Sequence, residues 1–423
     1  MGAWKKDVGL TYEEALQWIH SVGRFGIRPG LERMNALMER LGNPHHQFKC
    51  IHIAGTNGKG STAAFITSVL RTADYRVGLY TSPYLEMFNN RISIDGRDII
   101  PEKLVENVKL IRPLVEELSR IPGLGPLTEF EVVTSIAFNY YAESAPDLVV
   151  LETGLGGRLD ATNIVSPLIT VITNISRDHT HILGSTLEKI AYEKAGIIKE
   201  RIPLFTAVHD PAAERVLQKS AADKRAPLYH VVSAGDNFAT TAGYHGIIEY
   251  GGRKIVPEGQ RFDCRGLQNE YRNIFIPLRG EYQVENAAVS IGVIESLGNE
   301  GFFVDEEALR EGLRAAKWPG RLEVLQKKPL VVIDGAHNTA AVRAMIRATA
   351  EHYTCRRLIM VVGIMEDKDM RGMLSLLSRV ADDLILTRPA IERAADPQEL
   401  RKIVEDENLG LTGASPLVEP DLP

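Results

Sequence analysis

Residues Ile51–Thr62 read IHIAGTNGKGST, and this stretch decides the fold of the first part of the chain. A short apolar run ends at Gly55, a glycine-rich turn surrounds Lys59, and apolar residues at helical spacing follow. This order predicts a strand, a loop and a helix. In such a loop the backbone N–H groups and the helix N-terminus bind phosphate, and the lysine adds a positive charge for the terminal phosphates. The stretch therefore predicts a protein that binds ATP or GTP.

The stretch departs from the strict P-loop pattern G-x-x-x-x-G-K-[ST] at two positions. Ile53 stands where the pattern has glycine, and Gly60 follows Lys59 where the pattern has a hydroxyl residue. The alternative interpretation is an ordinary glycine-rich turn between a strand and a helix, and the later motifs decide between the two.

Composition excludes several classes of protein. The chain has 423 residues, which is too many for one ordinary core, so we expect at least two domains. A net charge of −6 gives no basic surface for nucleic acid. No run approaches the roughly 20 apolar residues of a membrane span, and the N-terminus lacks the apolar segment of a secretory signal. The scattered Cys50, Cys264 and Cys355 indicate neither a disulfide framework nor a zinc site, so a cytoplasmic protein is expected.

Strand and helix patterns alternate along the first 300 residues. Continuous apolar runs at Pro146–Glu152 and Pro167–Thr173 are typical of strands that are covered on both faces. Further strands are predicted at Arg76–Tyr80 and Ile202–Ala207, and helices at Tyr12–Val22, Leu31–Leu41, Pro101–Arg120, Glu129–Ala142, Leu187–Ile198 and Tyr282–Leu297. This alternation predicts an α/β fold with a doubly wound parallel sheet.

Two regions differ from this pattern. Tyr244–Leu278 is rich in β-forming residues, Gly and Arg, which predicts a small antiparallel appendage. A second α/β pattern starts near Pro329 and predicts a smaller, Rossmann-like C-terminal domain. Its predicted elements are a strand and then a loop at Leu330–Asn338, strands at Arg357–Gly363 and Asp383–Thr387, and helices at Ala340–His352, Met370–Val380 and Pro397–Glu405. We expect domains at residues 1–298 and 299–423.

Polar residues follow several predicted strands in the first domain. Glu152 ends a strand, where a carboxylate faces the crevice of a parallel sheet and suits Mg²⁺ beside nucleotide phosphates. His179 lies in the polar segment after the next strand and is a candidate metal ligand, whereas His181 is expected to be a bystander. The alternative for Glu152 is an ordinary carboxylate before a glycine turn, and the alternative for His179 is a structural histidine. Lys194, in the predicted helix Leu187–Ile198, is a further candidate, and its alternative is a place on a solvated helix face.

The second domain offers a basic and an acidic candidate. Arg321 precedes a strand, and an arginine from a second domain suits the negative charge of a transferred phosphoryl group. Asp334 and His337 come just after that strand. The alternatives are a loop arginine that pairs with any nearby acid and an Asp/Asn turn that caps the next helix.

Taken together, these segments resemble one known family. GTNGKGS, TSPYL, LETGLGGRLDATN, NISRDHTHILG, EKAGIIK, QVENAA, WPGR and DGAHN occur in the order and approximate spacing of the folylpolyglutamate synthase/dihydrofolate synthase family, which belongs with the Mur ligases. The resemblance covers nearly the whole chain. It implies a Mur-ligase-like ATP-binding domain at residues 1–298 and a Mur-ligase-like glutamate-ligase domain at residues 299–423.

The resemblance implies an ATP-dependent ligase that joins L-glutamate to a folate-type carboxylate through an acyl phosphate. By this resemblance the nucleotide contacts are Gly55, Thr56, Asn57, Gly58, Lys59, Gly60, Ser61, Asn286, Arg321 and Asp334. The implied catalytic residues are Lys59, Lys194, Arg321 and His337, and the implied Mg²⁺ ligands are Ser82, Glu152, His179 and a carbamylated Lys194. The loop Tyr84–Ile92 resembles the one that closes near the pterin. A hinged two-domain cleft builds such a site alone, so we expect a monomer.

Several alternatives stay open at this point. The folate could be dihydropteroate, a reduced folate that is extended by further glutamates, or both. Another Mur-type amide ligase is a competing enzyme, although only about 50 residues precede Ile51, and a regulatory GTPase lacks an N-K-x-D signature. The chain also ends at Pro423, before the helix and strand that family members usually carry, so we expect a truncated second domain and, as an alternative, an impaired ATP-binding remnant.

Overall fold

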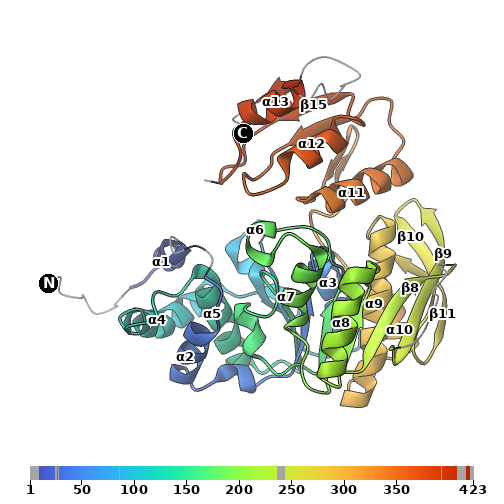
Figure 1. Ribbon diagram of the computed structural model, residues 1–423. Coiled ribbons are helices and arrows are strands. Elements are labelled where there is room, and N and C mark those ends of the chain that lie inside the picture. Colours follow the sequence, from blue (N-terminus) through green and yellow to red (C-terminus); the bar gives the residue numbers. More distant parts are fainter. Residues whose placement is uncertain are drawn as a thin grey trace.

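The computed structural model describes residues 9–23, 26, 28–84, 86–235, 243–391, 393–406 and 416–419. These residues form a large N-terminal body and a smaller C-terminal unit, which lies above the body in Figure 1 in orange and red. The predicted glycine-rich loop Gly23–Gly30, the loop Tyr84–Ile92 and the last residues Glu419–Pro423 lie partly outside the described residues.

The body is built on one sheet of eleven strands in the order β11-β10-β9-β8-β7-β6-β1-β5-β2-β3-β4. Its strands are β1 (Cys50–Ala54), β2 (Val77–Tyr80), β3 (Ile92–Ile94), β4 (Arg97–Asp98), β5 (Leu148–Glu152), β6 (Ile169–Ile172), β7 (Leu204–Thr206), β8 (Leu228–Ser233), β9 (Gly246–Val256), β10 (Gly259–Arg265) and β11 (Glu270–Ile276). The central strands from β8 to β2 are parallel, as predicted. The fold is therefore α/β with a mixed sheet rather than a wholly parallel one.

The antiparallel region predicted as an appendage is instead a continuation of this sheet. Strand β9 pairs with β8 in parallel, from Tyr229 opposite Gly246 to Ser233 opposite Tyr250, so no break separates the two parts. Strands β9, β10 and β11 then run antiparallel, as expected for Tyr244–Leu278, with register shifts around Phe262. Such bulges increase strand twist, which lets a long sheet curl at its edge. At the opposite edge, β3 and β4 add a second antiparallel end.

Helices cover both faces of the sheet and make three layers. One face carries α3 (Lys59–Thr72), α9 (Glu281–Leu297) and α10 (Glu306–Ala315), and the other carries α1 (Tyr12–Val22), α2 (Glu32–Arg40), α4 (Pro101–Leu118), α5 (Glu129–Ser144), α7 (Leu187–Ala195) and α8 (Pro211–Asp223). A short helix, α6 (Thr180–Leu183), lies at the edge that faces the C-terminal unit (Figure 1). None of the described helices has the length and apolarity that crossing a membrane would require.

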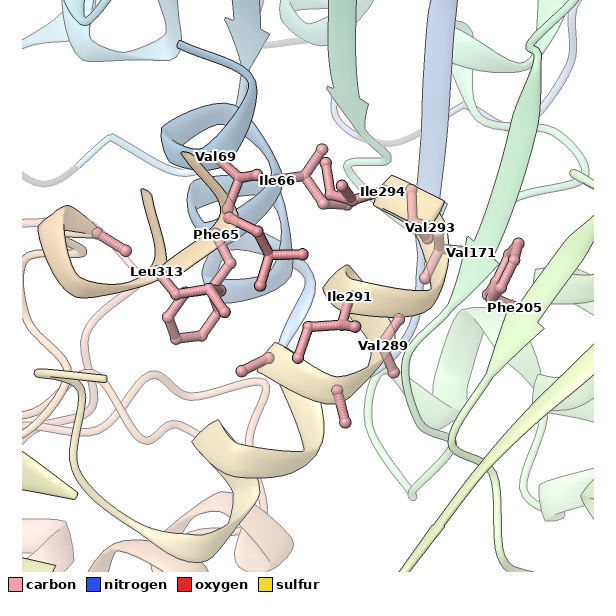
Figure 2. Packing of buried hydrophobic residues seen from close by; sticks show 14 of the residues in the cluster. Phe65, Ile66, Val69, Val171, Phe205, Val289, Ile291, Val293, Ile294 and Leu313 are labelled. Atoms are coloured by element: carbon pink, nitrogen blue, oxygen red, sulfur yellow. The ribbon is translucent and has the colours of Figure 1, made fainter. Parts of the chain in front are cut away.

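The core beneath α3 and α9 fixes the position of the glycine-rich loop. Phe65 and Ile66 of α3 pack with Val289 and Val293 of α9, all fully buried, and Leu313 of α10 closes the cluster (Figure 2). Truncating a buried aromatic of this kind costs about 3–5 kcal/mol of stability. Because α3 starts at the loop, this packing holds the loop in place.

The C-terminal unit is smaller and its strands are more exposed. It contains an antiparallel pair, β12 (Glu323–Lys327) and β13 (Leu330–Ile333), and a parallel sheet of β14 (Ile359–Val362), β15 (Asp383–Leu386) and β16 (Leu417–Val418). Helices α11 (Thr339–His352), α12 (Met370–Leu377) and α13 (Pro397–Asp406) alternate with these strands. The alternation agrees with the α/β pattern predicted from Pro329 onward.

The two-domain division at residue 298 stays a prediction. Helix α10, which follows that position, packs against α3 of the body, where Ser68 Oγ donates a hydrogen bond of 2.6 Å to the Gly312 carbonyl. The chain crosses to the C-terminal unit after Trp318, whose indole ring lies beside Gly60 of the glycine-rich loop.

Candidate active site

The glycine-rich loop joins β1 to α3 at the carboxyl edge of the sheet. Gly55 and Gly58 have φ values of +148° and +84°, and a side chain at either position would collide with Thr173 or Asn286. The Thr56 amide donates a hydrogen bond of 2.8 Å to the Asn174 carbonyl. The neighbouring β6 edge thus braces the loop and leaves the N-terminus of α3 facing the space above the sheet, where backbone N–H groups bind anions.

Lys59 lies next to the buried carboxylate of Glu152. The Lys59 ammonium donates to the Gly55 carbonyl at 3.2 Å and lies 3.8 Å from the Glu152 carboxylate. Burial raises the pKa of Glu152, and the positive charge of Lys59 opposes that rise. The Ser82 amide donates to the other Glu152 oxygen at 3.4 Å. A cation, a carboxylate and a hydroxyl residue from three strand ends therefore meet at the loop.

Lys194 of α7 reaches the same loop from the other side. Its side chain is buried, with 3% of the residue exposed, and its ammonium donates to the Gly55 carbonyl at 2.7 Å. Burial, together with the charge of Lys59, lowers the pKa of Lys194 to about 7. The amine is therefore partly neutral near physiological pH, which is the form that reacts with electrophiles such as carbon dioxide.

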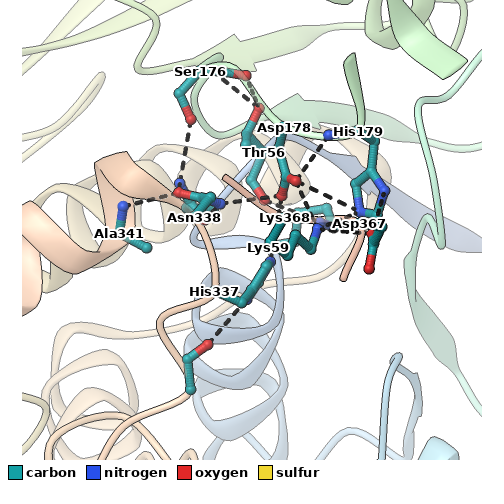
Figure 3. Close-up of polar contacts among 12 residues, drawn as sticks. Thr56, Lys59, Ser176, Asp178, His179, His337, Asn338, Ala341, Asp367 and Lys368 are labelled. Atoms are coloured by element: carbon teal, nitrogen blue, oxygen red, sulfur yellow. Dashed lines mark hydrogen bonds and ion pairs between the residues drawn. The ribbon is translucent and has the colours of Figure 1, made fainter. Parts of the chain in front are cut away.

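A second charged cluster follows β6 and includes a residue from the C-terminal unit. Lys368, in the turn between β14 and α12, donates to the Asp178 carboxylate at 2.7 Å and lies 3.1 Å from Nε2 of His179 (Figure 3). Burial by itself would raise the pKa of Asp178, but hydrogen bonds from His337 and Lys368 lower it well below its usual range. Burial lowers the pKa of His179 to about 4, so the imidazole is neutral at pH 7.

Asn338 connects the two parts of the molecule at the start of α11. Its side-chain oxygen accepts the Ala341 amide at 2.9 Å and caps the helix, and its Nδ2 donates to Asn57 at 2.9 Å and to Asp178 at 3.1 Å (Figure 3). His337, next to it, is exposed and lies 3.5 Å from the Asp178 carboxylate. The C-terminal unit thus touches the glycine-rich loop directly through Asn57.

Arg321 and Asp334 form the other wall of the space. The Asp334 carboxylate accepts the amides of Leu322 at 2.9 Å and Ala336 at 2.8 Å, so it shapes the turn after β13. Burial raises the pKa of Asp334, and the nearby Arg321 guanidinium opposes the rise. Asn286 of α9 is buried opposite Gly58, and its amide donates to Gln283 at 3.0 Å.

One cavity of about 360 Å³ lies between these walls. It is lined by the predicted site residues Gly55, Thr56, Asn57, Gly58, Lys59, Gly60, Ser61, Ser82, Glu152, His179, Lys194, Asn286, Arg321, Asp334 and His337. The structure therefore brings every residue that the sequence indicated to one place. Their individual roles stay predictions.

The donor set fits Mg²⁺ in part. Glu152 offers a buried carboxylate and Ser82 a neighbouring hydroxyl, which are oxygen ligands of the kind that Mg²⁺ prefers. Nε2 of His179, by contrast, lies against the Lys368 ammonium, and Lys194 is an amine bonded to a carbonyl. Among the described residues, no group of three or more His, Cys, Asp or Glu side chains is arranged to hold a metal ion.

The sequence interpretation missed three residues of the site. Asp178 and Asn338 lie inside segments that were noticed, yet only their neighbours were singled out. Lys368 was not noticed at all. It follows β14, which pairs in parallel with β15, so the rule that polar residues gather after parallel strands could have found it.

Two family models match the chain. Residues 125–294 match the Mur ligase middle domain, and residues 320–420 match the Mur ligase glutamate ligase domain. A dihydrofolate synthase/folylpolyglutamate synthase of Bacillus subtilis is 42% identical over 400 residues, which cover 94% of this chain and 90% of the relative.

Solved structures of folylpolyglutamate synthases also match this chain. The folylpolyglutamate synthase of Mycobacterium tuberculosis, complexed with ADP and AMPPCP, superposes with a TM-score of 0.86 and 33% identity over 97% of this chain and 89% of the other. A complex of FPGS with AMPPCP and folate superposes with a TM-score of 0.82 and 32% identity, and the match covers 97% of both chains. That coverage gives no support to the expected loss of a C-terminal helix and strand.

Proposed function

The chain belongs to the dihydrofolate synthase/folylpolyglutamate synthase family of Mur ligases, and from this membership we propose that it joins L-glutamate to a folate-type carboxylate at the cost of ATP. The observation that carries the proposal is the cavity that fifteen predicted residues line together. A phosphate-binding loop on one wall and Arg321 and His337 on the other suit the transfer of a phosphoryl group between two anions.

The nucleotide binds on the N-terminal body. The amides from Gly55 to Ser61 and the N-terminus of α3 receive the phosphates, with Lys59 at the terminal ones. Asn286 of α9 and Asp334 of the C-terminal unit contact the rest of the nucleotide. Gly58 leaves no room for a side chain against Asn286, so the loop backbone and Asn286 lie close together.

The chemistry proceeds in two steps. The folate carboxylate attacks the γ-phosphorus of ATP, the bond to ADP breaks, and an acyl phosphate forms. The glutamate amine then attacks the acyl carbon, loses a proton, and expels phosphate to leave an amide. Both steps bring negative groups together, so they need positive charge and positioning more than covalent help. Lys59 and Arg321 supply that charge, and His337 faces the amine.

Mg²⁺ is proposed to bind at Glu152 and Ser82, where it would neutralise charge on the phosphates. Ser82 then provides the hydroxyl that Gly60 cannot provide in this variant P-loop. His179 would join Glu152 and Ser82 as a third ligand. A carbamate on Lys194 would be a ligand for a second ion, because a carbamate replaces a repelling ammonium by oxygen ligands. The neutral fraction of Lys194, with its pKa of about 7, supports this modification.

Family membership also leads to proposals for the substrates, the oligomeric state and the cellular location. We propose dihydropteroate, a reduced folate or both as the carboxylate substrate, with the loop Tyr84–Ile92 near the pterin. We propose a monomer, because a hinged two-domain cleft can build such a site within one chain. The free cysteines Cys50, Cys264 and Cys355 support a reducing, cytoplasmic location.

Isotope transfer tests this function directly. The folate carboxylate is labelled with oxygen-18 and incubated with the chain, ATP, Mg²⁺ and glutamate, and the released phosphate is examined by mass spectrometry. Formation of an acyl phosphate moves one labelled oxygen to phosphate. Glutamate-dependent ADP release without labelled phosphate would contradict the acyl phosphate, and no ADP release with dihydropteroate or tetrahydrofolate would contradict the ligase itself.

A further inference from the structure

We propose that Lys368 and Asn338 are positioning residues that hold the C-terminal unit closed over the glycine-rich loop, with Asp178 as their shared partner. We call the contact among Asp178, Asn338 and Lys368 the latch. Its kinetic consequence rests on the proposed function, whereas its conformational consequence does not.

The latch is buried although it joins two separate parts of the molecule. The side chains of Lys368 and Asp178 are only 7% and 8% exposed, and their charged atoms are 2.7 Å apart. The second Asp178 oxygen accepts from Asn338 Nδ2 at 3.1 Å. Removing one partner of a buried ion pair leaves the other charge buried without compensation, so substitution of either residue should disfavour the closed arrangement.

Both residues of the C-terminal unit are held ready for this contact. The turn that carries Lys368 is closed by its own amide, which donates to the Met365 carbonyl at 3.1 Å. The next residue, Asp369, caps α12 through the Gly372 amide and accepts the Thr339 hydroxyl at 2.9 Å. Thr339 follows Asn338 in the chain, so the two arms of the latch are tied to each other. They therefore act as one rigid surface.

The opposite end of α11 is also attached to the body. His352 Nε2 accepts the Gly280 amide at 3.2 Å, just before α9, and Arg253 of β9 bonds to Glu351 at 2.7 Å. Figure 1 shows α11 lying along the boundary between the body and the rest of the unit. One end of this helix is thus a pivot beside α9, and the other end carries the latch.

The position of the latch makes it a positioning device for the reaction. Asn338 also donates to Asn57, a residue of the phosphate loop, and His337 precedes it in the chain. Closing the latch therefore brings His337 and, across the turn, Arg321 to the phosphates. Opening it would leave the phosphate loop unchanged but would remove these groups from the reacting atoms. Arg321 and Asp334 of the unit are also proposed nucleotide contacts, so opening the latch lowers turnover and weakens nucleotide binding together.

Distance measurement between spin labels tests the latch without reference to activity. Labels are placed at Ala222→Cys on α8 and Gln398→Cys on α13, both exposed sites, in a chain with Cys355→Ser. In the nucleotide-free protein, Lys368→Met should lengthen and broaden the label-to-label distance, and Lys368→Arg should keep it near that of the parent. Lys402→Met, an exposed lysine on α13, is the matched control and should change nothing.

Asn338→Ser gives an independent reading if Lys368→Met fails to fold. Serine still caps α11 but has no amide to donate to Asp178 and Asn57. It should also lengthen the distance, with the melting temperature of the unit preserved. Unchanged distances in every folded variant of Lys368 and Asn338 would overturn the latch.

Kinetics separates a positioning role from a merely structural one. Lys368→Met should lower kcat/KM for ATP about tenfold, and Lys368→Arg should recover most of the loss. No loss in Lys368→Met, or a loss that Lys368→Arg does not recover, would overturn the positioning role. If no ligase activity exists in the parent chain, the proposed function fails while the distance measurement still decides the latch.

Discussion

Strands β5 and β14 are both parallel strands, yet they are built differently. Strand β5 ends at Glu152 in the cavity, and β14 leads to the turn of Lys368, which contacts Asp178. All five residues of β5 in the body are buried, and Val150 is fully inaccessible. In β14 of the C-terminal unit, Ile359 and Val361 are each 54% exposed. The body therefore surrounds its strands with packed side chains, whereas the described part of the unit leaves one side of β14 open.

The attachments of the site residues differ in the same way. In the body, Glu152, Lys59 and Lys194 are anchored on elements with continuous apolar cores. The unit is joined to the body by polar contacts of Lys368 and Asn338 at the site and of His352 at the far end of α11. Apolar packing fixes geometry, whereas polar contacts can be exchanged for water or ligand. The body thus holds its site residues in a fixed geometry, and the position of the C-terminal unit determines whether the site is complete.

The largest effect expected is that of removing the phosphate-binding cation from the body. Lys59→Ala should lower kcat about 10²–10³-fold, because the preorganised charge at the terminal phosphates is lost. The fold should persist, since the side chain faces the cavity and α3 keeps its packed face. Steady-state ADP release measures the first effect and thermal unfolding the second. Lys219→Ala on exposed α8 is the control, and near-parent turnover of Lys59→Ala would refute the phosphate role.

Loss of the buried amine should come next. Lys194→Ala is expected to lower kcat about 10²-fold, with partial rescue by short carboxylates that stand in for a carbamate. Carbon dioxide adds only to the neutral amine, so with a pKa of about 7 the carbamate should form above pH 7 and decline below it. Carbon-13 NMR with labelled bicarbonate measures this. A signal that persists in Lys194→Ala would assign the carbamate elsewhere.

The magnesium dependence should respond more weakly. His179→Ala should raise the Mg²⁺ concentration for half-maximal rate about tenfold, because one ligand of a multidentate site is lost while Glu152 remains. His181→Ala, an exposed neighbour, should leave the titration unchanged. An identical Mg²⁺ titration for His179→Ala and the parent would make His179 a structural residue.

The smallest effect is expected on the free energy of unfolding when the exposed strand β14 is changed. This prediction tests the comparison of β5 with β14. Val361→Ala should change the free energy of unfolding by less than about 0.5 kcal/mol, as is usual for exposed positions. The same substitution at buried Val150 should cost about 2 kcal/mol through lost burial and a small cavity. Denaturant unfolding compares the two variants. Equal losses of unfolding free energy in Val361→Ala and Val150→Ala would show that β14 is covered in solution.

Much of the body could be predicted from the sequence because its signals are local. The helix at Tyr12–Val22 is confirmed at both ends, and Thr11 and Glu14 form a capping box at its N-terminus. The apolar runs before Glu152 and Thr173 are confirmed as buried parallel strands. Polar residues at the ends of parallel strands meet at one edge by geometry alone, which is why the predicted residues after β1, β2, β5 and β6 share one cavity.

The remainder depends on contacts between distant parts of the chain. The pairing of β8 with β9, which joins the predicted appendage to the sheet, has no local signal. Lys368 lies 190 residues from Asp178 in the sequence, and a lysine in a polar turn resembles any solvated residue. Only the packing of the unit on the body turns it into a buried partner.

Substrate-dependent ADP release by the full chain tests the central claim most directly. The measurement uses ATP, Mg²⁺ and L-glutamate, with dihydropteroate and tetrahydrofolate side by side and with glutamate omitted as the control. We predict ADP release that requires both glutamate and a folate. The folate substrate that gives the faster release identifies the main activity. ATP binding without glutamate-dependent release for either folate would contradict the assignment of this cavity to folate ligation.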